Sequence, residues 1–305
     1  MQTTRPAAAQ TTPPGAEQAP SRAVRGLGRH TLALPSLGWT VLFFVAPLVL
    51  LVLYSFGTRN VLTYEVEFGW TLQNYSDVWH GLYIDALLRS LALSAAATFA
   101  CLLIGFPVAY TIARAGRRMQ LVLLLLVMVP FWTSFVVRTY GVFNVIGDRG
   151  PLQQLLKALG LVGGDIHLLF TPVGVGIGIV YTYLPLMILP LYVALERIDP
   201  ALLEAASDLG ARPVRTLLRV IVPLALPGIV GGCVLVGIPA TGEYVIPQIL
   251  GGGKTLMIGN VIADQFLEIG DFPFGAALAM VLTAIVMAIL LLVRARADRG
   301  ETVTS

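Results

Sequence analysis

The fold is decided by the stretch from Glu204 to Pro227, EAASDLGARPVRTLLRVIVPLALP. It lies between two long apolar runs and is the most charge-dense part of the interior sequence. It predicts two short helices. Asp199 can cap the first helix and Pro200 suits its first turn. Gly210 stands where a helix commonly ends in the left-handed conformation. Apolar residues at helical spacing should line one face of this helix: Leu202, Ala206 and Leu209.

Pro213 can open the second helix, which should also have an apolar and a basic side. The predicted apolar stripe is Val214, Leu217, Leu218 and Ile221. The arginines expected on the other side are Arg212, Arg215 and Arg219. Two amphipathic helices with a glycine elbow suggest a docking surface for a soluble partner. The alternative is a surface loop that only links two membrane spans.

Composition indicates a membrane protein. The 305 residues are 56% apolar and only 12% charged, with a mean hydropathy of +0.81, whereas soluble domains average roughly 25% charged residues. At about 20 residues per span, roughly six helices fit. We therefore expect an all-α membrane protein with six transmembrane helices. The predicted spans are 38–56, 91–113, 121–137, 172–194, 224–246 and 274–293.

The predicted organisation is one membrane domain between two tails. Residues 1–35 should form a disordered tail, 36–297 the transmembrane domain with a loop at 196–223, and 298–305 a second tail. The fifth span is interrupted by Pro227, Pro239 and Pro247, and such breaks occur where backbone is buried in protein or lines a cavity. Small residues in the fourth and fifth spans favour close packing: Gly174, Gly178, Gly228 and Gly232.

The basic residues predict the orientation. If the N-terminus is inside, 14 of the 20 Lys and Arg residues face the cytoplasm, which favours two cytoplasmic termini and a cytoplasmic 196–223 loop. The outer loops carry more acids than bases, which would attract cations. Residues 150–162 predict an amphipathic helix on the outer surface.

The chain shows no catalytic or metal-binding motif. Gly252-Gly253-Lys254-Thr255 resembles the end of a phosphate-binding loop, but Gln248 stands where that motif needs glycine. Cys101 and Cys233 lie in apolar runs and are expected to be free thiols, and three histidines are widely scattered. We expect no enzyme activity, cofactor, metal or nucleic acid.

The opening stretch resembles the EAA loop of binding-protein-dependent ABC transporter permeases. The matching residues are Glu204-Ala205-Ala206, Gly210, and Val220-Ile221-Val222-Pro223. The spacing is intact, and valine replaces isoleucine and leucine of the family pattern at two positions. The resemblance implies a type I-like importer fold in which Glu204, Ala205, Ala206, Gly210 and Pro223 couple the spans to a cytoplasmic ATPase. It also implies an ATP-binding dimer, a second permease that is identical or homologous, an external solute-binding protein, and an inner-membrane location in contact with lipid.

Three passages resemble spermidine/putrescine-type permeases. They are Pro130–Ser134 with Arg138–Tyr140, Tyr181–Pro185 with Ile188–Pro190, and Gly242–Pro247 through Met257–Gly259. The resemblance implies transport of a small organic cation. Permeases for other small solutes, such as opines, organic acids, iron or thiamine, are the alternative, because related importers share parts of these passages.

Glu243 is the strongest candidate for contact with the solute, since an ionisable residue near a proline-broken span is a functional-site hypothesis. Its carboxylate could pair with an ammonium, and aromatic neighbours could offer ring faces to the same cation. Those candidates are Tyr244, Trp132 and Tyr140. The alternative is a structural ion pair with Arg138 or Lys254.

Two other classes of protein fit less well. An ion-coupled carrier or channel predicts several charged residues inside spans or an inverted repeat, and the sequence offers only Glu243 near a span end. A membrane enzyme predicts paired acids or a metal cluster within the spans, and the sequence of the predicted spans has neither.

Overall fold

The structure is a computed structural model that describes residues 35–60, 65–160 and 166–301, with side chains up to Ala295. The tail predicted for residues 1–35 lies almost wholly outside the described residues. The N-terminal unit, up to Leu50, and the unit from Leu51 onward are described separately. A helix begins at Pro35 in the first unit and includes the π-helical turn η1 (Val41–Val45). It continues as α2 (Ala46–Ser55), which extends beyond Leu50.

The second unit is built almost entirely of helices. Its first elements are β1 (Thr58–Arg59), β2 (Val66–Glu67), α3 (Gln73–Asp77), α4 (Gly81–Arg114), α5 (Arg117–Met128), η2 (Val129–Trp132), α6 (Phe135–Ile146) and α7 (Pro151–Ala158). They are followed by α8 (Pro172–Glu196), α9 (Pro200–Asp208), α10 (Pro213–Thr216), η3 (Leu217–Ile221), α11 (Val222–Leu224) and α12 (Leu226–Thr241). The last elements are α13 (Val245–Gly251), α14 (Ile258–Asp264), η4 (Gln265–Ile269) and α15 (Phe272–Glu301).

Four described helices are long and apolar enough to cross a membrane: Pro35–Ser55, Gly81–Arg114, Pro172–Glu196 and Phe272–Ala295. Two bent pairs, Arg117–Trp132 with Phe135–Ala158 and Pro213–Leu224 with Leu226–Thr241, bring the number to six if each pair counts as one span. This confirms the predicted helical membrane fold. The antiparallel pair β1–β2, two residues per strand, is the departure from all-α structure. Helix α15 runs to Glu301, into the segment where a tail was expected from residue 298.

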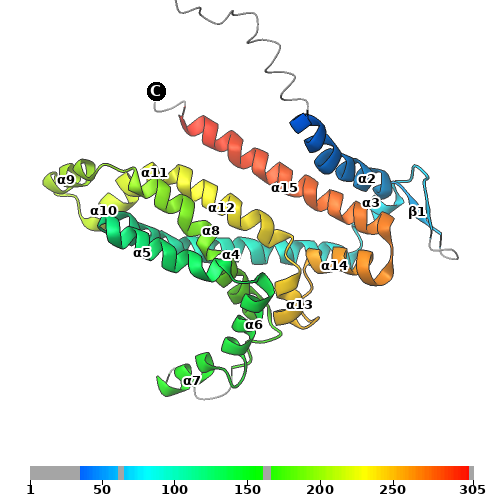
Figure 1. Cartoon of the computed structure of the whole chain (residues 1–305), viewed down its shortest axis with the longest axis horizontal. Coiled ribbons are helices and arrows are strands. Elements are labelled where there is room, and N and C mark those ends of the chain that lie inside the picture. The colour runs from blue at the N-terminus through cyan, green and yellow to red at the C-terminus, as the bar shows by residue number, and fades with distance from the viewer. Residues whose placement is uncertain (1–34, 61–64, 161–165, 302–305) are drawn as a thin grey trace, which may run out of the picture. The chain divides into compact units, whose positions relative to one another are not determined.

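Helices α4, α8 and α12 pack side by side and form the centre of the second unit (Figure 1). Their shared core includes Ile112, Met187, Leu191 and Leu195, all at most 1% exposed. Close approach depends on small residues: a Cβ on Gly228 would lie 2.5 Å from Ala194 Cβ and 2.6 Å from the Pro190 oxygen. A Cβ on Gly178 would press on Leu250 and Ile246 of α13, and one on Gly232 on Met187 of α8, which confirms close helix packing at these positions. A Cβ on Gly174 would instead meet the backbone of Leu168, in the segment before α8.

The third and fifth apolar runs are not straight helices. The first bends by 97° near Thr133, where the Pro130 carbonyl accepts a hydrogen bond from Thr133 Oγ1 at 2.7 Å. The second bends by 69° between α11 and α12. Helix α12 contains Pro239 and ends two residues later, at Thr241. The last residues of the predicted fifth span, 245 and 246, therefore begin a separate helix, α13. Proline favours such breaks because it lacks the backbone N–H that continues a helix.

The predicted functional segments lie apart. Helices α9 and α10 lie at one end of the bundle formed by α4, α8 and α12, and α13 and α14 lie toward the other end (Figure 1). The predicted outer helix forms as α7. Cys101 and Cys233 are free thiols, as expected.

Candidate functional site

Helix α9 is a short helix with a defined beginning and end. The Asp199 carboxylate accepts a hydrogen bond from the Ala201 N–H at 2.9 Å, and Pro200 occupies the first turn, as predicted. At the other end, the Gly210 N–H donates to Ser207 O and the Ala211 N–H donates to Ala206 O. Gly210 has φ +72°, in the left-handed region that this paired arrangement requires. Local sequence therefore fixes α9 without support from a large core.

The side chains of α9 point largely away from the rest of the chain. Glu204 and Ala205 are exposed, Ala206 is half-buried, and Leu209 is 89% exposed. Leu203 packs against the core formed by α4, α8 and α12. The predicted face of Leu202, Ala206 and Leu209 is thus mostly unburied within this chain. The reason is that α9 contacts the core through a different turn position, Leu203, which leaves an apolar surface free.

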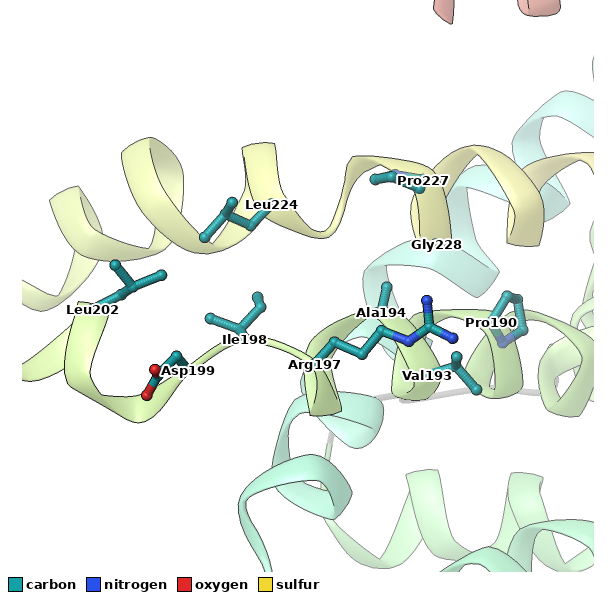
Figure 2. A pocket seen from close by; sticks show the side chains of 10 residues that line it. All are labelled: Pro190, Val193, Ala194, Arg197, Ile198, Asp199, Leu202, Leu224, Pro227 and Gly228. Atoms are coloured by element: carbon teal, nitrogen blue, oxygen red, sulfur yellow. The ribbon is translucent and has the colours of Figure 1, made fainter. Parts of the chain in front are cut away.

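A cavity of about 540 Å³ lies beneath the beginning of α9, between the end of α8 and the α11–α12 bend (Figure 2). Its lining residues come from these three segments: Pro190, Val193, Ala194, Arg197, Ile198, Asp199, Leu202, Leu224, Pro227 and Gly228. The cavity is mainly apolar, with Arg197 and Asp199 as its charged residues. The cavity therefore lies where the beginning of α9, the end of α8 and the α11–α12 bend meet.

Two arginines from the α4–α5 turn hold the stem of the loop. Arg114 Nη1 donates to the Ile198 carbonyl at 3.3 Å, just before α9 begins. Arg117 Nη1 lies 3.5 Å from Glu196 Oε1 at the end of α8. These contacts connect α4 and α5 to the segment between α8 and α9. The sequence pattern does not reveal these two contacts, because the partners of Arg114 and Arg117 lie about 80 positions away along the chain.

The second half of the loop departs from its predicted sides. Pro213 opens α10 as expected, and Leu217 and Ile221 pack into the core. Val214 and Leu218 are instead exposed, at 66% and 61%. Pro223 lies in α11 and is exposed. The predicted apolar stripe is therefore divided between the core and the surface.

Glu243 lies at the other end of the bundle and is 7% exposed. Its Oε2 accepts a hydrogen bond from Tyr183 Oη at 2.5 Å. Its Oε1 lies 3.1, 3.0 and 3.4 Å from the backbone N–H nitrogens of Tyr244, Val245 and Ile246, the beginning of α13. The carboxylate therefore caps α13 and joins it to α8.

Further polar contacts surround this carboxylate. Asn260 Nδ2 donates to Tyr244 O at 2.9 Å and lies 3.2 Å from Gln248 Oε1. Gly259 packs so closely that an added Cβ would lie 2.5 Å from Gly242 O and 2.6 Å from Glu243 O. Together, α8, α13 and α14 form a buried polar cluster at the break after α12.

The predicted aromatic residues are not gathered around Glu243. Tyr244 is 46% exposed, Trp132 75% and Tyr140 53%. In the described part of the chain, no hydrogen bond or ring contact links Trp132 or Tyr140 to Glu243. The predicted ion pairs of Glu243 with Arg138 or Lys254 are likewise not formed there: Arg138 stacks over Phe131, and Lys254 lies over Phe170. Backbone N–H groups and a tyrosine hydroxyl satisfy the carboxylate instead.

Sequence reasoning missed two members of this cluster, Tyr183 and Asn260. Tyr183 lies inside the passage Tyr181–Pro185 and Asn260 directly follows Met257–Gly259, so both stand in or beside segments that already carried a resemblance. The sequence does not reveal that Tyr183 pairs with Glu243, since these two residues are 60 positions apart.

Comparisons with known proteins cover nearly the whole chain. The family model of the binding-protein-dependent transport system inner membrane component matches residues 18–299. The spermidine/putrescine transport system permease protein PotB of Escherichia coli (strain K12) is 45% identical over 262 residues, which cover 86% of this chain and 94% of that protein. The inner membrane ABC transporter permease protein YdcU of the same strain is 34% identical over 269 residues, with 84% and 85% covered.

A solved structure is also similar in fold. A chain of a bacterial ABC transporter involved in the import of the acidic polysaccharide alginate superposes with a TM-score of 0.71 and covers 92% of this chain and 99% of that one. The sequences are 17% identical, so this similarity shows the type I importer fold alone.

Proposed function

Because the chain belongs to the family of binding-protein-dependent transport system inner membrane components, we propose that it is the transmembrane permease subunit of an ABC importer for a small organic cation such as spermidine or putrescine. The observation that carries the substrate class is the 45% identity to the spermidine/putrescine permease along 94% of that protein. The three passages around Trp132, Tyr183 and Glu243 support the same class.

The loop at α9 is the proposed contact with a cytoplasmic ATP-binding subunit. Glu204 and Ala205 are exposed, and Leu209 offers an apolar side chain that this chain does not cover. A small alanine lets a partner approach closely, and a carboxylate at Glu204 can pair with a basic residue. Closure of an ATPase pair would displace α9 as a rigid element, and the Arg114 and Arg117 contacts would carry that displacement to α4 and α5.

The assembly we propose contains this permease, a second identical or homologous permease, a dimer of ATP-binding subunits and an external solute-binding protein. Dependence on a binding protein is part of the family description. ATP hydrolysis belongs to the partner subunits in this proposal, and the excess of basic residues in the predicted inner segments supports two cytoplasmic termini.

The proposed solute pathway passes the break at Glu243. Tyr244, Trp132 and Tyr140 have exposed rings that suit an organic ammonium. Glu243 would add negative charge beside Tyr244 while its oxygens hold α13. Because the hydrogen bonds of Glu243 are already satisfied, the rings are the proposed direct contacts and the carboxylate is the electrostatic support behind them.

The experiment is ATP-dependent uptake by the complete importer in proteoliposomes, with labelled spermidine and putrescine as solutes. The complex should be purified through this chain, so that its ATP-binding and solute-binding subunits are those it retains. We expect uptake that requires ATP on the side of the vesicle membrane where the ATP-binding subunits lie. It should also require the solute-binding protein on the opposite side. Transport by this chain alone without ATP would overturn the proposal, and uptake of a different solute would correct only the substrate class.

A further inference from the structure

The segment after the elbow has a surface that the proposed coupling role does not use. A groove of about 550 Å³ lies along α10 and η3, and we name it the basic groove. It is lined by Gly210, Arg212, Val214, Arg215, Leu218 and Arg219. Every charged residue that lines it is an arginine. In the described part of the chain, these three guanidinium groups form no ion pair.

Three sides can be distinguished around this segment. Leu217 and Ile221 face the protein core. Val214 and Leu218 are exposed although they are apolar, at 66% and 61%. The arginines that share the groove with them are exposed as well. A segment that presents a core side, an exposed apolar side and a basic side in turn is typical of a helix at a membrane interface.

The direction of the segment agrees with that position. Pro213–Leu224 and Leu226–Thr241 meet at 69°. With Leu226–Thr241 placed along the bilayer normal, this bend would put the preceding segment nearer to the plane of the bilayer than to its normal. Val214 and Leu218 can then reach the acyl boundary, while long arginine side chains extend to the headgroups.

We infer that the basic groove binds the headgroups of anionic phospholipids in the cytoplasmic leaflet and anchors the second half of the loop to the membrane. The inference rests on the proposed cytoplasmic placement of the loop. Arginine suits a phosphate because its planar guanidinium makes paired hydrogen bonds to phosphate oxygens. The two halves of the elbow would then have different partners, a protein at α9 and the membrane at α10 and η3.

The test measures the lipid that the full permease chain retains. The chain is purified without an ATP-binding subunit, placed in nanodiscs and then extracted from them with detergent. The discs contain phosphatidylcholine alone or an equimolar mixture of phosphatidylcholine and phosphatidylglycerol. Mass spectrometry then gives the phosphatidylglycerol that remains bound per chain after detergent extraction. One variant combines Arg212→Gln, Arg215→Gln and Arg219→Gln. The matched control replaces the same three residues by lysine, which keeps the charge.

We expect the wild-type chain to retain phosphatidylglycerol in preference to phosphatidylcholine and the lysine variant to keep most of this preference. Each basic residue near an anionic surface contributes roughly a fivefold change in association, so the glutamine variant should lose the preference by at least about tenfold. Val214→Ser with Leu218→Ser should weaken retention without changing charge.

Two results would overturn the inference. One is a wild-type chain without preference for phosphatidylglycerol, which needs no variant to fold. The other is a glutamine variant that retains phosphatidylglycerol as the wild-type chain does. If that variant, expressed in a separate preparation with the ATP-binding subunit, also fails to retain the subunit, the groove belongs to that protein contact instead. Neither result depends on which solute is transported, so a failure of the polyamine proposal would leave this measurement unaffected.

Discussion

The loop at α9 and the cluster around Glu243 are both short breaks between long helices, yet they treat their side chains in opposite ways. Helix α9 is fixed by its own cap and glycine turn and leaves Leu209 89% exposed. Glu243 is 7% exposed and engages a tyrosine and three backbone N–H groups. A surface for another subunit can remain open in one chain, whereas a polar group buried among spans must be satisfied within the chain.

The largest expected effect comes from removing the carboxylate of the cluster. Glu243→Ala leaves the Tyr183 hydroxyl and the first N–H groups of α13 without their partner, at about 1–3 kcal/mol for each buried group left unpaired. We expect a large fall in the thermal unfolding temperature of the purified chain. Glu243→Gln keeps an oxygen for the N–H groups and should be milder.

The same pair of variants separates the two roles of Glu243. If Glu243→Gln is stable and transports normally, its charge is not part of the solute pathway. If Glu243→Ala unfolds at the wild-type temperature, the capping account is contradicted.

A smaller loss is expected from Gly259→Ala. The new Cβ would press on the backbone oxygens of Gly242 and Glu243, which cannot move as the end of a flexible side chain can. Overpacking of this kind costs about 1–3 kcal/mol. Gly81→Ala is the matched control, because no atom lies within 4 Å of its added Cβ. Equal expression and unfolding temperature of the two variants would argue against tight packing at α14.

At the other break, Arg114→Ala should affect coupling more than folding. It removes the donor to the Ile198 carbonyl, at about 1–2 kcal/mol for a charged hydrogen bond that is partly solvated. We expect ATP hydrolysis by the complex to continue with less solute moved per ATP. Arg118→Ala, at an exposed position nearby, is the control. A normal ratio of transport to hydrolysis would show that the Arg114 contact does not transmit motion.

The smallest effect is expected from Asp199→Ala, which removes the cap of α9. Loss of a helix N-cap costs about 1 kcal/mol, so the unfolding temperature should change little while the affinity for the ATP-binding subunit falls several-fold. Asp199→Asn can still accept the Ala201 N–H and should restore that affinity. If Asp199→Ala binds the ATP-binding subunit as tightly as Asp199→Asn and the wild-type chain do, the partner and not the cap orders α9.

The sequence predicts best where structure depends on neighbours along the chain. Asp199, Pro200 and Gly210 specify the two ends of α9 by local geometry, and these predictions are confirmed. The helical membrane fold follows in the same way from the length and composition of the apolar runs.

It predicts less well where a contact joins distant segments. The partner of Glu243 is Tyr183 and not a basic residue, because the beginning of α13 supplies N–H groups that the sequence pattern does not reveal. The sequence pattern places Val214 and Leu218 on the same stripe as Ile221, but only packing against α4 and α8 decides which positions of that helix are buried.

Co-purification of the ATP-binding subunit with an Ala205→Trp variant tests the central claim most directly. Ala205 is exposed, so the larger side chain should not disturb this chain, and it should block the close approach of a partner to α9. We expect a folded permease in the membrane that no longer retains the ATP-binding subunit and no longer transports. A variant that keeps both the subunit and ATP-dependent uptake would contradict the assignment of α9 as the coupling helix.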